Sequence, residues 1–235
     1  MSAGKARQRG LSLVELMIAM VLGLVIVAAV FNAYASSRRS AQFTAGLQSM
    51  QENGRYGVSV LQKGLRLAGY SPAGELAPID LATSTDERIV VRLRQGWDCN
   101  GVDTAARGGV AENTYAYDAA ARRITCTGDS SPTAEPMSIV DDVDGFRLLY
   151  GVDEDGDCVP ERYVPHATLG VTGDPDSVAA LRFALLVGSG VPIRTRAWPE
   201  THVLLDRVVD TNDAVARTVF ASTVKLRNSR SECPA

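Results

Sequence analysis

An apolar run near the N-terminus is the feature that most constrains how this chain can fold. It covers residues 16–31, a single carboxylate, Glu15, precedes it, and a short basic leader ends at Gly10. Residues 11–35 have about the ~20 positions that a membrane-spanning helix needs. Basic residues before such a helix keep its N-terminus on the cytoplasmic side, so the chain beyond residue 35 is predicted to face the periplasm.

The carboxylate needs an explanation, because an acidic residue at the centre of a bilayer costs roughly 2.5–3.5 kcal/mol on insertion scales. The residues from Arg9 to Leu16 read Arg-Gly-Leu-Ser-Leu-Val-Glu-Leu. They resemble the processing site of type IV prepilins and of the pseudopilins of type II secretion. The resemblance implies cleavage after Gly10, methylation of the new N-terminus at Leu11, and Glu15 as the fifth residue of the mature chain. Leucine and serine stand first and second, where the family usually has Phe and Thr.

The same resemblance implies a function for Glu15. Cleavage would free an α-amine on Leu11 that is positively charged near neutral pH. An ammonium and a carboxylate are each costly in hydrocarbon, and pairing largely offsets that cost. We therefore expect Glu15 to neutralise the amine of a neighbouring subunit, or its own, during filament assembly. The alternative is a glutamate that only reaches the headgroups at the cytoplasmic face.

An ordinary secretory signal peptide is the main competing interpretation. Three basic residues precede the apolar run, and residues 33–35 (Ala-Tyr-Ala) form a possible cleavage site before Ser36. We favour the prepilin interpretation because the run is long for a signal peptide and has a charge at its start. The helical pattern also continues past Ala35. The mature N-terminus, Leu11 or Ser36, distinguishes the two.

Four cysteines lie in the part predicted to be exported, namely Cys99, Cys126, Cys158 and Cys233. An even number in an oxidising compartment favours disulfides over metal binding or catalysis. Three pairings are possible, and we favour Cys99 with Cys126 and Cys158 with Cys233. The first would close a loop of about 27 residues, worth roughly 3–4 kcal/mol in the chain-entropy model, and the second would hold the C-terminal tail against a loop. Reduced, buried thiols are the alternative.

The helix is predicted to continue beyond the membrane. Small or apolar residues recur at steps of four and three, which is typical of the buried seam of an amphipathic helix, and Gly69 and Pro72 would end it. Each glycine in the seam lowers helix propensity by ~1 kcal/mol relative to alanine. We therefore expect a sheet or another helix of the same chain to approach the backbone there. The seam comprises Phe43, Leu47, Met50, Gly54, Gly57, Leu61, Gly64 and Ala68.

Beyond Tyr70 the hydrophobic pattern changes to a period of two, which is typical of strands. The segment 178–187 is almost entirely apolar and is predicted to be a central strand buried on both faces. Residues 138–144 are predicted to form a helical turn or a loop. One long helix followed by mostly antiparallel strands defines the α+β class. Strands are predicted at 88–94, 112–118, 122–127, 145–152, 178–187, 202–205 and 215–226, with connections at 72–78, 128–136 and 188–199.

Several short patches in the exported part resemble PilW-type minor pilins. They are residues 57–70, the Asp98-Cys99 pair, the hairpin from Tyr115 to Cys126, the acidic stretch 150–157 and residues 226–228. The resemblance implies the type IV pilin fold, in which a long N-terminal helix packs on a mostly antiparallel sheet. It divides the chain into a leader peptide (1–10), a transmembrane and assembly helix (11–35), the amphipathic half of that helix (36–69) and a β-rich globular domain (70–235).

The resemblance also implies a function in assembly. Such a subunit sits in the inner membrane with a periplasmic ectodomain and moves to the pilus and cell surface when it assembles. Its implied partners are the prepilin peptidase, the inner-membrane assembly platform, other minor pilins, the major pilin and a tip adhesin. With other minor pilins it would form a tip complex that primes the pilus. The alternatives are a J-type minor pseudopilin of type II secretion and an adhesin or DNA-uptake subunit.

One metal candidate stands in the sequence, the acidic stretch with Asp153, Asp155 and Asp157. Alternate carboxylates in a turn suit a hard cation such as Ca²⁺. The stretch is not an EF-hand loop, because its glycine is fourth instead of sixth and Val164 stands where the last glutamate belongs. We expect a solvated, turn-forming loop rather than a calcium site.

No catalytic pattern is present, so we expect neither an enzyme nor a cofactor. Ser189 lies directly between two glycines, which is not the G-x-S-x-G nucleophile elbow. Neither His166 nor His202 has a patterned acid or nucleophile beside it, and phosphate-binding and dinucleotide fingerprints are absent. The whole chain has a net charge of −3, and without its first 35 residues, which hold three basic and one acidic side chain, the net charge is −5. Nucleic-acid binding is therefore not expected.

Overall fold

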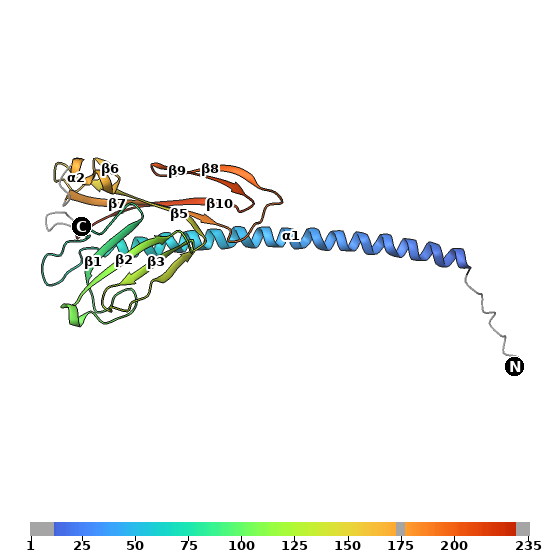
Figure 1. Cartoon of the computed structure of the whole chain (residues 1–235), viewed down its shortest axis with the longest axis horizontal. Helices are drawn as coiled ribbons and strands as arrows, with labels where there is room; N and C mark the ends of the chain where they lie inside the picture. The colour runs from blue at the N-terminus through green and yellow to red at the C-terminus, as the bar shows by residue number, and fades with distance from the viewer. Residues whose placement is uncertain (1–11, 173–176, 229–235) are drawn as a thin grey trace, which may run out of the picture. The chain divides into compact units, whose positions relative to one another are not determined.

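The computed structural model describes residues 12–172 and 177–228. The chain divides into two compact units, Met1–Ala45 and Gly46–Ala235, and helix α1 (Leu13–Arg66) contributes to both. The described residues form this helix, ten strands and three short helical segments, which places the protein in the α+β class (Figure 1). The short segments are η1 (Ala105–Arg107), η2 (His166–Thr168) and α2 (Leu169–Thr172).

In the first unit, α1 exposes apolar side chains on all its faces. Leu13 is 74% exposed, and the large apolar residues from there to Tyr34 are all at least half exposed. The helix is long and apolar enough to cross a bilayer. A helix with apolar residues on every face is stable only in lipid or among other apolar helices.

The second unit contains two four-stranded antiparallel sheets. The first has the order β1-β2-β3-β4 and the second has the order β10-β7-β5-β6. A separate two-stranded ribbon consists of β8 (Trp198–Leu204) and β9 (Arg207–Asp213). The strands of the first sheet are β1 (Arg88–Arg94), β2 (Val110–Asp118), β3 (Arg123–Gly128) and β4 (Met137–Asp141). Those of the second are β5 (Val143–Val152), β6 (Arg162–Val164), β7 (Val178–Gly188) and β10 (Arg217–Lys225).

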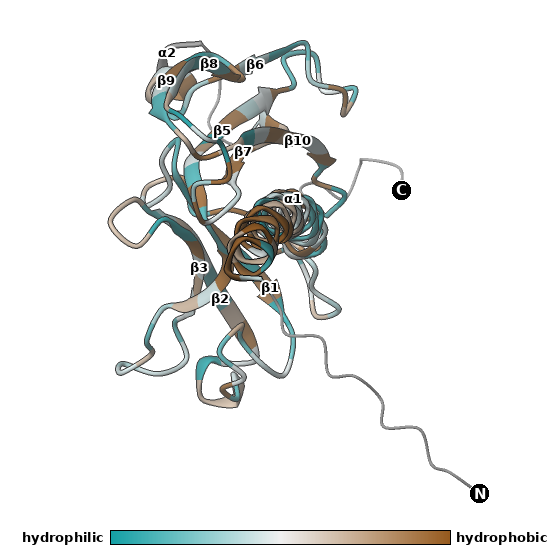
Figure 2. Ribbon diagram, turned by 90° about the vertical axis from the view of Figure 1, so that its right-hand side faces the viewer, coloured by the Kyte–Doolittle hydropathy of each residue, from teal (hydrophilic) through white to brown (hydrophobic). Residues whose placement is uncertain are grey.

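From Gly46 onward, α1 lies between these two sheets (Figure 2). Its glycines make the close approach possible. A Cβ at Gly57 would lie 2.6 Å from a methyl group of Val140 in β4, and a Cβ at Gly54 would overlap the ring of Phe220 in β10. The seam therefore contacts both sheets at once, and it buries Met50, Gly54, Gly57, Leu61 and Leu65.

The predicted seam is confirmed in most of its positions, with differences at both ends. Leu65 is fully buried, whereas Gly64 is only partly buried against the hydroxyl of Tyr115. Gly46 is buried beside Ile193 and was not predicted, while Phe43 is 44% exposed. The sheets begin to cover the helix near residue 46, so an apolar residue before that point has nothing to pack against within its own unit.

The strand predictions are confirmed for β1, β2, β3, β5, β7 and β10, with shifts of at most two residues at their ends. The strand predicted at 202–205 is present as β8 but begins four residues earlier, so residues 198 and 199 belong to it and not to the predicted connection at 188–199. β7 is the central strand that its apolar sequence predicts. The prediction of a turn or loop at residues 138–144 is wrong, because β4 and the start of β5 occupy it. Asp141, Asp142 and Asp144 lie at the junction of the two strands, where Asp142 has a left-handed φ of 59°. β6 and β9 were not predicted, since β6 is three residues long and β9, in a ribbon outside the main sheets, has only two adjacent apolar residues, Val208 and Val209, followed by four polar ones.

The glycine seam leads to a stability prediction. Alanine favours a helix over glycine by ~1 kcal/mol, but its Cβ at position 54 would collide with the Phe220 ring. Overpacking of this kind costs about 1–3 kcal/mol. We expect Gly54→Ala to lower the free energy of unfolding of the second unit, measured by urea denaturation of the detergent-solubilised chain. Gly23→Ala, whose added Cβ meets nothing within 4 Å, should leave it unchanged. Equal stability of the two variants would contradict the packing argument.

Candidate assembly site

The predicted assembly carboxylate, Glu15, lies in the first turn of α1 and is exposed. The first turn of a helix favours a negative charge, because the unpaired N–H groups of the backbone point outward there. Within residues 12–172 and 177–228, Glu15 has no ion-pair partner. The cleavage position Gly10 and the predicted new N-terminus Leu11 lie outside the described residues.

The surroundings of Glu15 are apolar and uncovered. Leu13, Val14, Leu16, Met17 and Ile18 are each at least half exposed. Apolar surface of this extent marks a membrane or protein contact. A carboxylate among these side chains can therefore reach either the aqueous boundary of a bilayer or a cation on a neighbouring helix.

The predicted disulfide between Cys99 and Cys126 is present in the structure. It joins the loop after β1 to β3, beside the buried side chain of Asp98. The carboxylate of Asp98 accepts hydrogen bonds from the backbone N–H groups of Asn100, Val102 and Ser130, at 2.9, 3.0 and 3.2 Å. These bonds lower the pKa of Asp98 even though burial, the largest influence, acts to raise it. For the second predicted disulfide, Cys158 is buried, whereas Cys233 lies outside the described residues.

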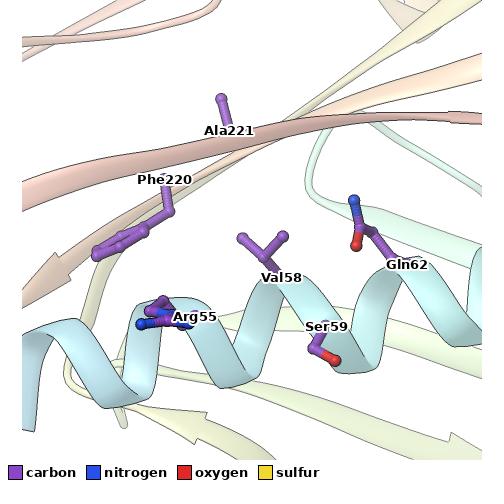
Figure 3. Close-up of a pocket in the computed structure, with 6 residues that line it drawn as sticks. All are labelled: Arg55, Val58, Ser59, Gln62, Phe220 and Ala221. Atoms are coloured by element: carbon purple, nitrogen blue, oxygen red, sulfur yellow. The ribbon is translucent and has the colours of Figure 1, made fainter.

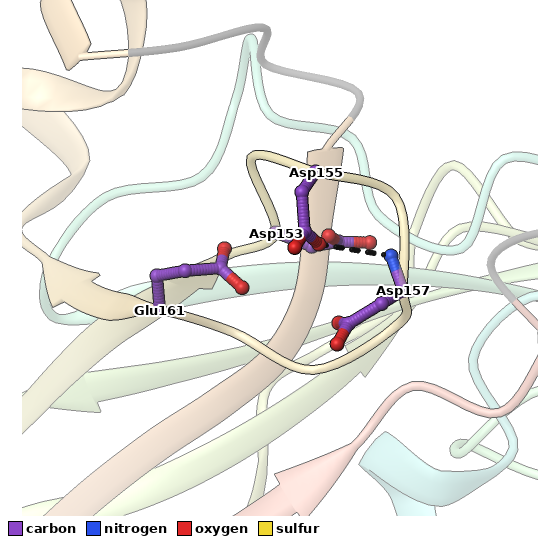
Figure 4. Close-up of side chains that lie close together, drawn as sticks. All are labelled: Asp153, Asp155, Asp157 and Glu161. Carbon is purple, nitrogen blue, oxygen red and sulfur yellow. Dashed lines mark hydrogen bonds between the residues drawn. The ribbon is translucent and has the colours of Figure 1, made fainter.

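The acidic stretch forms a tight loop between β5 and β6, and a fourth carboxylate, Glu161, joins it (Figure 4). One oxygen from each of Asp153, Asp155, Asp157 and Glu161 lies within 4.8 Å of the others. Oxygen ligands of this kind suit Ca²⁺. Sequence reasoning missed Glu161 because it lies outside the aspartate run, and only the return of the chain toward β6 brings it close.

These carboxylates hydrogen-bond to their own loop. Asp153 is buried and accepts the N–H groups of Gly156 and Cys158, at 2.7 and 3.1 Å. Asp155 accepts the N–H of Asp157 at 3.1 Å, and Asp157 that of Val159 at 2.8 Å. Glu161 accepts the N–H of Glu154 at 2.7 Å. Such bonds are typical of a turn-forming acidic loop, and they account for the close approach of the carboxylates.

A stability measurement tests this explanation. Removing the carboxylate of Asp153 leaves two backbone N–H groups without their acceptor, so Asp153→Ala should cost about 1–3 kcal/mol. Asp155→Ala, at an exposed position with one such bond, should cost less. Thermal denaturation in the presence of EDTA should show these differences in stability. Adding Ca²⁺ to the wild-type protein should not increase its melting temperature. A calcium-dependent increase that both variants abolish would instead identify a calcium site.

The side chains considered for catalysis have structural contacts. Nε2 of His166 lies 2.7 Å from the carbonyl oxygen of Leu81, and its ring lies edge-on to Tyr150. His202 lies beside Glu200 and Thr211 at 3.7 and 3.4 Å. Ser189 is buried and its hydroxyl donates to the carbonyl oxygen of Val191. His166 and Ser189 contact backbone carbonyl oxygens, and the Thr211 hydroxyl lies farther from Nε2 of His202 than the roughly 2.6–3.2 Å of an activated nucleophile.

A network of charges fixes the start of β10. Arg217, whose side chain is only 7% exposed, contacts Asp144 at 2.6 Å and Asp213 at 2.7 Å, and Arg122 contacts Asp144 at 2.6 Å. The network links β10 to β5, β9 and the turn between β2 and β3. The hydrogen bonds from Arg217 hold the pKa of Asp213 at about 2, and the two carboxylates raise the pKa of Arg217.

The lowered pKa predicts how stability depends on pH. Asp213 has a pKa of about 2 in the folded protein and an ordinary value of 3.8. The stabilisation that its ion pair with Arg217 gives to the fold is therefore fully present above pH 3.8, and it is lost as the pH falls through about 2. We expect Asp213→Asn to lose less stability than wild type over this range, measured as melting temperature against pH. High salt should reduce the difference because Asp213 is half exposed. Identical profiles would contradict the pairing.

The fold and the N-terminal segment together define a class of protein, a pilin with a long apolar N-terminal helix, consistent with a membrane anchor, and a β-rich globular unit. Residues 5–31 match the prokaryotic N-terminal methylation motif. Residues 109–228, about half of the chain, match the family described as type IV pilus-assembly protein W. The chain belongs to the PilW family of type IV pilus-assembly proteins, a family of structural pilins.

Among solved structures, the type IV-like pilin TTHA1219 from Thermus thermophilus is similar. The match covers 77% of this chain and 98% of that chain, with 18% sequence identity and a TM-score of 0.49. No curated protein matches the chain.

Proposed function

We propose that this protein is a minor pilin that primes assembly of a type IV pilus as part of a complex with other minor pilins. The observation that supports the proposal most directly is the position of Glu15, a lone carboxylate in the first turn of an uncovered apolar helix. It stands five residues after Gly10, within the segment that matches the methylation motif.

In the proposed mechanism, the prepilin peptidase removes residues 1–10 and Leu11 becomes a methylated N-terminus. Before assembly, the subunit remains in the inner membrane with its globular domain (70–235) in the periplasm. Its helix enters the filament from the lipid when Glu15 neutralises the N-terminal amine of a neighbour. Pairing lowers the desolvation cost that both charges have in lipid, so the helical bundle becomes more stable than the dispersed subunits.

The two parts of the helix would then have different functions. The assembly segment (11–35) supplies lateral packing through its exposed apolar side chains. The amphipathic segment (36–69) joins the assembly segment to the globular domain. From residue 46 onward, the amphipathic segment lies between the two sheets. The globular domain would select the neighbours, among them other minor pilins, the major pilin, the assembly platform and a tip adhesin.

The proposal predicts that Glu15→Ala is processed normally but is not incorporated. An unpaired charge left in the helical bundle costs several kcal/mol, so we expect incorporation to fall by more than about tenfold. Mass spectrometry of the purified protein should find the N-terminus at methylated Leu11, and immunoblotting of sheared pili against membranes measures incorporation. Glu52→Ala, at an exposed position of the same helix beyond the apolar run, is the control and should assemble normally.

Two results would contradict this mechanism. Normal incorporation of Glu15→Ala would remove the carboxylate from assembly, and a mature N-terminus at Ser36 would show that the anchor is a signal peptide. The priming function has a separate test. Deleting the protein should reduce the number of pili while the major pilin remains in the membrane, and an unchanged number of pili would contradict priming.

A further inference from the structure

Strand β10 ends its sheet with a long and regular edge. It pairs with β7 over nine consecutive residues without a register shift. The strand contains no proline, and its lysine lies at its last position, Lys225. Natural proteins usually protect an edge by making it short, bulged, proline-containing or covered. Within the described residues, no strand pairs with the other side of β10.

The other outer edges of the two large sheets have such protection. The 69–80 segment covers β1, since Gly69 donates to the carbonyl oxygen of Arg92 at 2.8 Å and Asp80 to that of Val90 at 3.0 Å. β4 is five residues long and its pairing with β3 contains a register shift. β6 is three residues long. Strand β10 is therefore the exception among the four edges in the described part of the chain.

The backbone groups that face outward from β10 follow from its register. At one end Ser189 donates to the carbonyl oxygen of Ala216 at 2.9 Å, and at the other Leu226 donates to that of Ala179 at 2.8 Å. In an antiparallel pair such bonds occur at every second residue. The N–H and C=O groups of Val219, Ala221 and Thr223 therefore point away from β7, and those of Phe220 and Ser222 point toward it.

A groove of roughly 280 Å³ runs between this edge and one flank of α1 (Figure 3). It is lined by Arg55, Val58, Ser59, Gln62, Phe220 and Ala221. Phe220 points toward the helix and Ala221 points away from it (Figure 3). At one end, the Gln62 side chain donates to the hydroxyl of Ser222 at 2.6 Å. The groove thus combines a strand edge with an apolar contact between Phe220 and the helix flank.

The helix flank is basic. Arg55 lines the groove, and Arg66 lies one helical turn beyond Gln62 on the same face. Both are exposed, and neither forms an ion pair with any described residue. Glu52, the nearest acid along the helix, forms no ion pair with Arg55. A positive flank in a chain with a net charge of −3 favours a negatively charged occupant.

We propose that the β10 edge and this groove bind an extended, acidic segment of another pilin subunit as an added strand. The added backbone would bond to the outward groups of Val219, Ala221 and Thr223. Alternate side chains would enter the groove, with a carboxylate on Arg55. Main-chain bonds supply the affinity in this mode of recognition, and the groove supplies the selectivity. The inference rests on the proposed function only for the identity of the partner as a subunit.

The test uses the full chain in detergent and two synthetic peptides. One alternates Val with Glu, and the other has Lys in place of every Glu. Hydrogen exchange resolved by residue measures protection, and fluorescence anisotropy measures affinity. We expect the acidic peptide to slow exchange at Val219, Ala221 and Thr223 but not to alter Phe220 and Ser222, which β7 already protects. It should bind about tenfold more tightly than the basic peptide, the equivalent of one charge-assisted hydrogen bond.

Three variants make the test specific. Ala221→Pro removes an outward N–H, which an edge strand tolerates, and should abolish the alternating protection without lowering the melting temperature. Arg55→Glu keeps the strand intact and should reverse the preference between the peptides. Glu15→Ala should leave peptide binding unchanged, so a failure of the assembly mechanism is distinguished from a failure of this site.

Each opposite result overturns the proposal. Protection without alternation, equal affinity for both peptides, or wild-type binding by Ala221→Pro and Arg55→Glu would exclude an added acidic strand. A concentration-dependent dimer in sedimentation, dissociated by Ala221→Pro, would assign the edge to a second copy of this chain instead.

Discussion

The close contact between the glycine seam of α1 and the two sheets is the interaction on which the globular unit depends. Gly54 and Gly57 let Phe220, Val140 and Leu185 approach the helix backbone from β10, β4 and β7. Each missing side chain costs helix propensity, and the apolar burial offsets that cost. Because the seam contacts both sheets, it also fixes how they are placed around the helix.

One helix thus has two environments. Up to Ala45 its apolar side chains are uncovered, and from Gly46 its seam is buried between sheets. The same secondary structure continues because helix formation satisfies the backbone equally well in lipid and in a protein core. Only the surroundings of the helix change. This suits a subunit that, as we propose, is stored in a membrane and selects its neighbours through its globular domain.

The acidic loop shows how similar residue patterns can have different chemical meanings. Four carboxylates converge, as they do in a cation site, yet each accepts a backbone N–H of the loop itself. The Arg217 network, in contrast, could not be predicted from the sequence. Nothing in the spacing of Arg122, Asp144, Asp213 and Arg217 suggests a cluster, since tertiary folding alone brings β5, β9, β10 and a hairpin turn together.

Among the possible cysteine pairings, the sequence only favoured Cys99–Cys126. By itself it determined the α+β class, the family, the long helix and most strands. These depend on local periodicity, composition and a short motif, which are properties of neighbouring residues. Tertiary structure alone decided that Leu65, and not Gly64, is fully buried in the seam. It also decided that residues 138–144 belong to strands β4 and β5 and their junction. It further decided that β10, beside a basic groove, is the edge with no pairing strand among residues 12–172 and 177–228. Register, edges and covering segments arise from contacts between residues far apart in the chain, and no local pattern encodes them.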